Sequence, residues 1–395
     1  MQLQFNVIDA DSHAQVHKDA FTSRMSAARF GERIPHLIET DEGHQRWIVN
    51  GKRVSDSGVS NCPAVMDDHF RTRQPQRWEE VPAPVYDPLA RLRVMDEDGV
   101  DVEVLFPNPP IQGAAFLQGD AEFELACVRA YNDAMFEWRR ASDRYVPLGL
   151  IPYLSGAAVA AAEVERIAQL GMRGIDVVAE PGIVAHPGQI FLSSFAEEAA
   201  HIPHFSDPGW DPLWAACQAN AISIHWHVNG QLPLPVPRWP AYTLGQNRVL
   251  VPGPICTMMA QFIPHLLFSG VLERFPRLQW VLTETGMGFI QYIVEACDRE
   301  WERMRLWSEG ILTRPSELLR RQLYGTVWYE QNGIKSRAVL GCDRIMFQVD
   351  YPHNTSIYPR THQAIETVLA GLPQAEREAI LWRNAARLYG LQISE

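Results

Sequence analysis

Eight strand-like runs alternate with helical patterns along most of this sequence, and this alternation is what most constrains the fold. The runs are rich in β-branched and aromatic residues and span 5–11, 100–106, 146–152, 173–179, 221–227, 278–284, 324–330 and 345–350. Helical patterns lie between them, at 120–141, 155–170, 211–220, 288–308, 333–340 and 358–371. Near-continuous apolar runs are typical of parallel strands buried on both faces. The alternation therefore predicts an α/β protein, a closed (β/α)8 TIM barrel.

Three segments interrupt the alternation and are expected to form long loops near the active site. Residues 30–85 predict an inserted β-hairpin, with two short runs around a turn at Asp41–Glu42–Gly43. The segments 180–210 and 229–254 are rich in proline. All three follow strands on the side where a barrel holds its active site. Because no interdomain linker is visible, we expect residues 1–395 to form a single domain with 30–85 as its cap.

Charge and cysteine pattern exclude several classes of partner. The net charge of −12 argues against nucleic acid or an anionic membrane, because both require a basic surface. No apolar run reaches the roughly 18 residues of a membrane span, and no signal peptide precedes the first strand. The six cysteines are scattered without CxxC spacing, as in reduced cytoplasmic proteins. We therefore expect a cytoplasmic protein that acts on a small molecule.

Carboxylate and imidazole side chains stand at the ends of four of the strands. They are Asp11 and His13 on strand 1, His225 and His227 on strand 5, Glu284 on strand 6 and Asp350 on strand 8. Inward-facing residues at the carboxyl ends of barrel strands converge on one pocket. Such side chains are ligands for Zn, Mn and Fe. Their coincidence at four strand ends predicts a metal-dependent enzyme rather than a binding module.

Several stretches of the sequence together match a known group of enzymes. They include DADSH at 9–13, RVMDEDGVDVEVLFP at 93–107, TETG at 283–286, DYPH at 350–353 and RNAARLYGL at 383–391. With them the chain resembles the amidohydrolase-related metal enzymes of the aminocarboxymuconate-semialdehyde decarboxylase type, over nearly its whole length. The resemblance implies the barrel and the metal. It leaves the reaction open between decarboxylation, carbon–carbon hydrolysis, lactone and amide hydrolysis, and oxygen chemistry.

The resemblance also implies roles for individual residues. Asp11 and His13 correspond to the strand-1 pair and are assigned to the metal. Asp350 is assigned both as a ligand and as the base for a metal-bound water. Strand 5 supplies a further histidine ligand, and the count from the preceding turn favours His225. The other histidine, His227, could then bind the substrate or a second metal. Alternatively, it could hydrogen-bond to a residue that binds the first metal.

Glu284 departs from the family pattern, in which histidine at the end of strand 6 often acts as the acid/base. A buried glutamate near a cation can shuttle protons with a raised pKa, or it can become a ligand. A structural salt bridge is the alternative for Glu284. His353 is expected to brace the site, and His353, Trp226 and Arg238 are weaker candidates for substrate binding. Strand 4 offers no lysine that could bridge two metals by carbamylation, which argues against a binuclear hydrolase.

The sequence thus predicts one divalent ion, zinc before manganese or iron, with a second metal left open. The predicted ligands are Asp11, His13, His225 and Asp350, and the predicted catalytic residues are Asp350, Glu284 and His227. The predicted reaction is non-oxidative decarboxylation or metal-water hydrolysis of a small carboxylated, cyclic or aromatic substrate. The alternatives are a dinuclear Fe/Mn oxygen-activating hydroxylase and a non-catalytic partner subunit. The resemblance further implies a homodimer.

Overall fold

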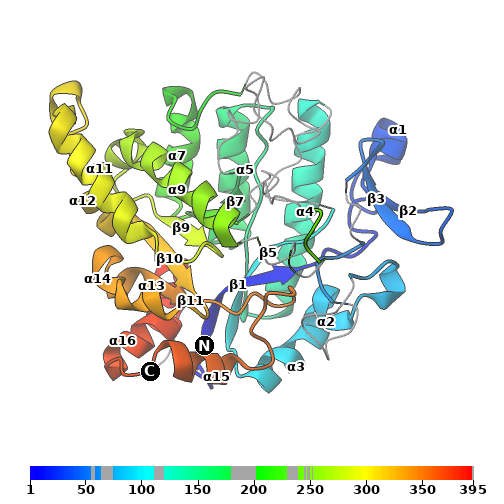
Figure 1. The fold of residues 1–395 in the computed structure, drawn as a ribbon. Helices are drawn as coiled ribbons and strands as arrows, with labels where there is room; N and C mark the ends of the chain where they lie inside the picture. The colour runs from blue at the N-terminus through cyan, green and yellow to red at the C-terminus, as the bar shows by residue number, and fades with distance from the viewer. Residues whose placement is uncertain are drawn as a thin grey trace.

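The structure is a computed structural model, and parallel strands surrounded by helices make up most of it (Figure 1). It describes residues 1–54, 58–63, 74–110, 120–178, 202–228, 239–243, 246, 250 and 252–393, without the side chains of 252 and 254–258. The predicted loops at 180–210 and 229–254 therefore lie mostly outside the described residues. None of the described helices is both long enough and apolar enough to cross a membrane.

The parallel strands fall into two sheets. One sheet has the order β1 (Ile8–Ala14), β5 (Val102–Pro107), β6 (Tyr145–Pro147). The other has the order β11 (Ile345–Phe347), β10 (Leu323–Val327), β9 (Trp280–Thr283), β8 (Ser223–His227), β7 (Gly174–Val177). Each of these strands overlaps one of the runs that the sequence predicts to be a strand. All neighbouring pairs within both sheets are parallel, which confirms the predicted α/β class.

Single bridges join the two sheets at both of their edges. Gly149, just after β6, bridges in parallel to Ile175 of β7, and Ser12 of β1 bridges to Tyr351, just after β11. The described strands are therefore two sheets in contact at two seams, rather than one continuous hydrogen-bonded sheet. The second seam brings the first and last parallel strands of the chain together.

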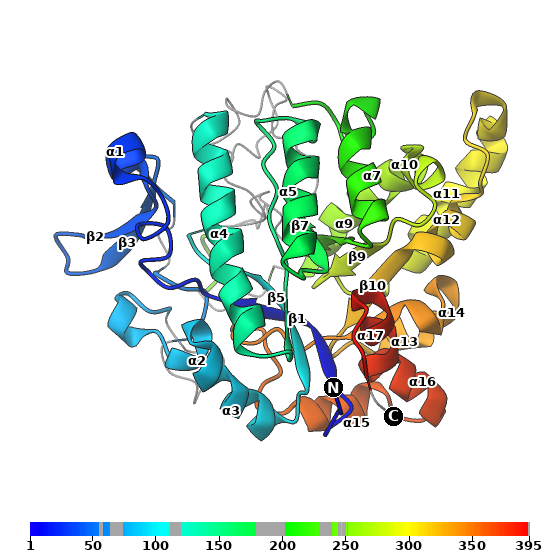
Figure 2. The same cartoon turned by 180° about the vertical axis from the view of Figure 1, so that it is seen from behind.

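Helices cover the outside of the sheets (Figures 1 and 2). The α-helices are α1 (Ala27–Phe30), α2 (Ala83–Tyr86), α3 (Pro88–Asp98), α4 (Ala121–Ala141), α5 (Ala157–Gln169), α7 (Asp211–Ala219), α9 (Pro252–Phe268), α10 (Val271–Arg274), α11 (Ile290–Met304), α12 (Pro315–Gln322), α13 (Gln331–Lys335), α14 (Arg337–Leu340), α15 (Thr361–Val368), α16 (Gln374–Glu378) and α17 (Asn384–Tyr389). Short 3-10 turns lie at Gly31–Arg33, Trp78–Glu80, Pro208–Trp210, Leu306–Glu309 and Cys342–Arg344, and a π turn lies at Ala379–Arg383. The long helix α4 begins where the Asp120 carboxylate accepts the N–H of Phe123 (2.8 Å).

The core explains why the strands read as continuous apolar runs. Val104 packs in a cluster with Val281, Met346 and Tyr389, which come from β9, β11 and α17. Its neighbour Leu105 packs in the larger cluster against the helices. Successive side chains of a strand point to opposite faces, so both faces of the sheets are buried. Among the buried polar residues, Asp11, His13 and Glu284 lie toward or just after the carboxyl ends of strands.

An antiparallel sheet lies in the segment 30–85. Strands β2 (His36–Glu39) and β3 (Gln45–Val49) pair antiparallel, and β4 (Lys52–Arg53) continues the sheet. Trp47 is fully buried, and its indole N–H donates to the carbonyl of Val59 (2.9 Å). Trp47 and Val59 belong to a small apolar cluster of their own, so this segment carries its own core.

Candidate metal centre

A shift of register at the end of β1 orients the first candidate ligands. The pairing of β1 with β5 shifts between Asp9 and Ser12, as at a β-bulge. The Asp9 carboxylate fixes this bend, because its Oδ1 accepts the N–H groups of Asp11 (3.0 Å) and Val349 (2.7 Å). The hydroxyl of Ser12 donates to the other oxygen. Asp9 thus ties the backbone of β1 to the chain leaving β11 and leaves Asp11 to face the interior.

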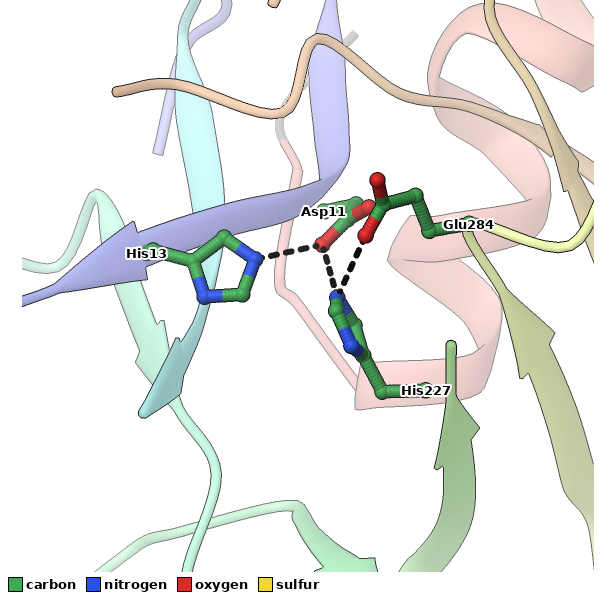
Figure 3. Close-up of side chains that lie close together, drawn as sticks. All are labelled: Asp11, His13, His227 and Glu284. Atoms are coloured by element: carbon green, nitrogen blue, oxygen red, sulfur yellow. Dashed lines mark ion pairs between the residues drawn. The ribbon is translucent and has the colours of Figure 1, made fainter. Parts of the chain in front are cut away.

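Four side chains meet at the carboxyl ends of β1, β8 and β9 (Figure 3). The Nε2 atom of His13 lies 3.5 Å from Oδ1 of Asp11. The Nε2 atom of His227 lies 3.5 Å from the same Asp11 oxygen and 3.2 Å from Oε2 of Glu284. The side chains of Asp11 and His13 are at most 3% exposed. Two imidazoles and two carboxylates therefore point at one another in a buried space.

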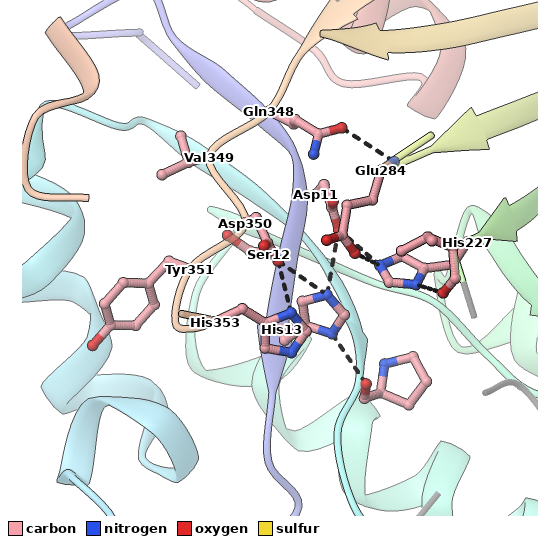
Figure 4. Close-up of polar contacts among 12 residues, drawn as sticks. Asp11, Ser12, His13, His227, Glu284, Gln348, Val349, Asp350, Tyr351 and His353 are labelled. Carbon is pink, nitrogen blue, oxygen red and sulfur yellow. Dashed lines mark hydrogen bonds and ion pairs between the residues drawn. The ribbon is translucent and has the colours of Figure 1, made fainter. Parts of the chain in front are cut away.

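Asp350 and His353 extend this cluster from the turn that follows β11 (Figure 4). Oδ1 of Asp350 lies 3.5 Å from Nε2 of His13 and 2.8 Å from Nδ1 of His353. The hydroxyl of Thr355 donates to the other oxygen, Oδ2. Asp350 is thus held on one oxygen and presents the other to the cluster.

The six side chains form two overlapping groups of metal-type donors. One group is Asp11, His13, His227 and Glu284, and the other is His13, Glu284, Asp350 and His353; within each, all donor atoms lie within 4.8 Å of one another. Both oxygens of Asp11 and the Nε2 atoms of His13 and His227 are buried without a hydrogen-bond partner. Buried polar atoms are normally satisfied, and an ion accounts for such a set of inward-facing lone pairs. The residues present therefore fit a divalent metal.

Hydrogen bonds on the outer side of each ring set the tautomers of the two histidines in the first group. Nδ1 of His13 lies 3.1 Å from the carbonyl oxygen of Pro107. Nδ1 of His227 lies 2.7 Å from the carbonyl oxygen of Val228. Because a carbonyl only accepts, each Nδ1 carries a proton, so each Nε2 is the nitrogen that offers its lone pair to the cluster when the ring is neutral.

The backbone is strained at both carboxylates that follow the later strands. Glu284, just after β9, has φ of +55°, and Asp350, just after β11, has φ of +63°. Residues other than glycine rarely adopt this region, and such strain collects at functional sites. The N–H of Glu284 is held by the side chains of Thr326 (3.2 Å) and Gln348 (3.3 Å). These contacts hold the backbone of Glu284 in the conformation that turns its carboxylate inward.

Burial opposes the charged form of each group in the metal-free cluster, and mutual attraction overcomes it only for Asp11 and His227. Burial raises the pKa of Asp11, but the charge of His227 and the contacts with both His13 and His227 together outweigh it and hold that pKa below its usual range. Burial lowers the pKa of His227, yet Asp11 and Glu284 together raise it to about 10. Burial lowers the pKa of His13 to about 4, so this ring is neutral. Burial and the charge of Asp350 raise the pKa of Glu284 well above its ordinary value.

The placement of the strand-5 histidines differs from the prediction that favoured His225. His227, the last residue of β8, lies in the donor cluster, whereas His225 belongs to neither group. Nε2 of His225 lies 2.9 Å from the hydroxyl of Ser223, and its ring stacks on Tyr389 at 5.8 Å. Two residues along a strand span about 7 Å, so His225 faces inward one layer deeper. The strand pattern indicates the inward face that both histidines share, and it carries no information on their depth.

The structure also locates the weaker candidates. Trp226 lies on the opposite face of β8, where its ring packs against Trp280 (4.8 Å) and Phe262 (6.1 Å) in the core. It is thus placed away from the donor cluster. Arg238 lies outside the described residues. His353, expected to brace the site, lies in the second donor group.

Sequence reasoning missed several residues around the cluster. Asn108 follows β5, and its Oδ1 lies 3.1 Å from Nε2 of His353. Asp176 on β7 is buried, and burial raises its pKa to about 7. Thr355 holds Asp350, as described above. Their only sequence signal was position: all three lie in or just after a predicted strand, which marks the active-site end of parallel sheets.

Comparisons with known proteins agree with this picture. The Amidohydrolase family model matches residues 10–391. An amidohydrolase from Mycobacterium avium subsp. paratuberculosis K-10 is 20% identical, with a TM-score of 0.76 over 98% of this chain and 100% of that one. A 5-carboxyvanillate decarboxylase from Sphingomonas paucimobilis is 22% identical, with a TM-score of 0.61 over 98% and 100%. A dihydroxybenzoic acid decarboxylase from Polaromonas sp. JS666, with bound manganese and the inhibitor 2-nitroresorcinol, is 19% identical, with a TM-score of 0.60 over 99% and 98%.

These structural likenesses show a shared fold, while the family match carries the assignment. No curated protein matches the sequence significantly. The family match spans almost the whole chain and includes the segments that bear all six donor residues. The chain belongs to the amidohydrolase family and is an enzyme of that family.

Proposed function

We propose that the chain is a divalent-metal-dependent lyase that decarboxylates a small aromatic or cyclic acid without oxidation. The observation that carries the proposal is the convergence of Asp11, His13, His227 and Glu284 as donors in a buried space at the ends of three strands, β1, β8 and β9. Two of the structural neighbours are named as decarboxylases of aromatic acids, which supports the substrate class.

The same four residues would hold the metal, with His227 and Glu284 in place of the predicted His225 and Asp350. Two imidazoles and two carboxylates suit Zn, Mn or Fe. We propose zinc as the resident ion, with manganese as its competitor, because the Polaromonas enzyme contains manganese. Bound there, a divalent ion would polarise the substrate's carboxylate and a neighbouring oxygen.

Asp350 is the proposed acid and base of the reaction. It lies beside the proposed ligands, and the Thr355 hydroxyl and the His353 ring fix its orientation. Its carboxylate takes the proton of a substrate hydroxyl. As the bond to the substrate's carboxylate breaks, carbon dioxide leaves, the ring carbon keeps the electron pair, and the proton held by Asp350 joins that carbon.

The test is release of carbon dioxide from a panel of hydroxybenzoates whose carboxylate is next to a hydroxyl. Metal-free protein should be inactive, and zinc or manganese should restore turnover. Asp350→Asn should keep the metal and lower kcat by about 100-fold or more, because it removes the proton carrier. Absence of carbon dioxide from every acid with fully metallated protein would overturn the proposal.

Hydrolysis is the second candidate function. The position of Asp350 is the observation that favours it. A carboxylate beside a proposed metal site can take a proton from water, which would then attack a carbonyl. Lactones, esters and amides of similar size would be substrates in that case. Turnover of these compounds, without carbon dioxide from the acids, would select hydrolysis.

The remaining expectations concern the whole molecule. We propose that the two sheets form one closed (β/α)8 barrel, supported by the bridges at both seams. We propose that residues 1–395 form a single domain, with 30–85 as a cap that carries its own small core. We also propose a homodimer in the cytoplasm; the five cysteines of the described part are unpaired, as a reducing compartment requires. Light scattering of the purified protein tests the dimer.

A further inference from the structure

Two buried side chains beside the donor cluster carry N–H groups that the described residues leave without an acceptor. They are Asn108, which is 1% exposed, and Trp328, which is 7% exposed. Neither Nδ2 of Asn108 nor Nε1 of Trp328 has a hydrogen-bond partner in the described part of the chain. Because buried donors are normally paired, each of them points to an acceptor that these residues do not supply.

Asn108 faces the cluster because it continues the inward face of β5. Phe106, two residues earlier, packs its ring against His227 (4.9 Å) and His13 (5.8 Å). Alternate residues of a strand share a face, so Asn108 stands on this face about 7 Å further toward the carboxyl end. Oδ1 of Asn108 lies 3.1 Å from Nε2 of His353, which fixes one end of the amide. The other end carries two N–H groups that remain to be donated.

Trp328 continues the inward face of β10 in the same way. Two residues earlier, the hydroxyl of Thr326 accepts the N–H of Glu284 (3.2 Å). The indole N–H of Trp226 is also unpartnered among the described residues, but that ring belongs to the main apolar core. Trp328 belongs to none of the apolar clusters that the described residues form. Its indole is therefore placed on the side of the site, beyond Glu284, rather than in the core.

The two donors lie on either side of the strands that lead to Asp350 and His13. In one sheet β10 pairs with β11, and in the other β1 pairs with β5. The seam between Ser12 and Tyr351 joins β1 to the chain that follows β11. A ligand held beside Asp350 therefore has one of the two N–H donors on each flank.

The chemistry of the donors limits the group that they can bind. An indole N–H and an amide NH₂ only donate, so each requires an accepting oxygen. Both donors are uncharged, whereas Asp11, Glu284 and Asp350 already place three buried carboxylates in the cluster. A further anionic group would be desolvated there without a cation beside it, which is costly, whereas an uncharged oxygen is not.

We propose that Asn108 and Trp328 form a substrate subsite for an uncharged oxygen substituent, such as an ether, a carbonyl or a hydroxyl. This substituent is additional to the carboxylate and the neighbouring oxygen that the metal would polarise. The inference rests on the proposed function, because it takes an acid bound beside Asp350 as given. It narrows the substrate to an acid with a further oxygen on its ring.

The experiment measures the affinity of substituted salicylates for the zinc-loaded full-length protein by calorimetry. The protein carries Asp350→Asn, so that bound acids are not consumed. Each free ring position is tested with a methoxy group, which accepts a hydrogen bond, and with an ethyl group of similar size, which does not. At one ring position or more, the methoxy acid should bind about 10-fold more tightly, because only its oxygen pairs with a buried donor.

Two substitutions remove the donors one at a time. Trp328→Phe keeps an aromatic ring and removes the N–H, and Asn108→Leu keeps the branched shape and removes the amide. Each should lower the methoxy preference at the ring position that it serves to below about 2-fold, with little change in affinity for the ethyl acid. Trp226→Phe is the matched control: it removes an unpartnered N–H from the core and should keep the full preference.

The outcomes separate the subsite from the reaction. Absence of a methoxy preference at every ring position overturns the inference, and so does survival of the full preference in both Trp328→Phe and Asn108→Leu. Neither result affects the proposed function, which release of carbon dioxide tests. If the protein with Asp350 intact releases no carbon dioxide from acids that bind with the methoxy preference, the proposed function is overturned and the subsite stands.

Discussion

Depth along a strand decides which residues of this protein can reach a bound ligand. His225 and His227 face the same side of β8, yet only the residue at the strand end lies beside Asp11 and Glu284. The ring of His225 lies deeper, where it contacts the hydroxyl of Ser223 and stacks on the ring of Tyr389. Chemically equal residues two positions apart thus have different neighbours.

Single substitutions of the two histidines measure this difference. Loss of a hydrogen bond to a metal ligand lowers metal affinity by about 10- to 100-fold. His227→Asn should lower the affinity by more than this, because it removes a proposed ligand itself. His225→Asn should change affinity much less. Competition for zinc with a chromophoric chelator gives both constants. The reverse order of effects would return the assignment to His225.

The ion pair between His227 and Asp11 makes the metal-free protein sensitive to alkali. Burial lowers the pKa of His227, but the neighbouring carboxylates raise it from the ordinary 6.5 to about 10. A group whose pKa rises on folding stabilises the fold fully below its unfolded value and loses this contribution toward the folded value. The Tm of metal-free wild type should therefore fall between about pH 6.5 and pH 10 more steeply than that of His227→Gln. Parallel curves for the two proteins in scanning calorimetry would contradict this.

At the scale of elements, the end of β1 depends on the carboxylate of Asp9. That side chain accepts the N–H groups of Asp11 and Val349 and the hydroxyl of Ser12, all of them buried. The Asp9 carboxylate thus supplies hydrogen-bond acceptors where the shift of register interrupts the pairing of β1 with β5. The positions of the first two proposed ligands follow from this contact.

Asp9→Ala should destabilise the fold on the order of 3 kcal/mol, because buried N–H groups lose their acceptor at about 1–3 kcal/mol each. Asp9→Asn should be milder, since its amide oxygen can still accept both N–H groups. Urea denaturation of the metal-free variants measures the difference. Similar losses in both variants would show that the charge of Asp9, rather than its acceptor oxygen, matters.

Elements were predictable from the sequence to the extent that local pattern defines them. The parallel strands appear as apolar runs because both of their faces are buried, and their ends carry Asp11, His13, Glu284 and Asp350. Asn108 could not be found in this way, because its partner His353 is 245 residues distant. The depths of His225 and His227 along β8 were not predictable either, since period reports the face of a residue and not its depth. Tertiary contacts supply both kinds of information.

At the scale of the whole molecule, Arg91 of α3 joins the seam between the two sheets. Its side chain is fully buried and pairs with Glu103 of β5 at 3.0 Å. The same guanidinium donates to the carbonyls of His13 (3.3 Å) and Tyr351 (3.3 Å), on either side of the seam. It also lies 4.0 Å over the ring of Tyr351.

Arg91→Met should cost about 3–5 kcal/mol of unfolding free energy, because it leaves Glu103 buried without its partner. The double variant Arg91→Met with Glu103→Gln should recover part of this loss. Chemical denaturation followed by tryptophan fluorescence compares the three proteins. No recovery in the double variant would place the cost in the lost carbonyl contacts instead.

The contact between Asp9 and Val349 spans 340 residues and has a consequence for how the protein is made. At roughly 5–20 residues per second, a ribosome needs roughly 20–70 s to synthesise that interval. During this time β1 has emerged, but the turn carrying Asp350 does not yet exist. The nascent chain can therefore pair β1 with β5 early and still lack Asp350, the proposed acid and base. Completion of the site is then an event at the end of translation, because it requires docking of the last strand.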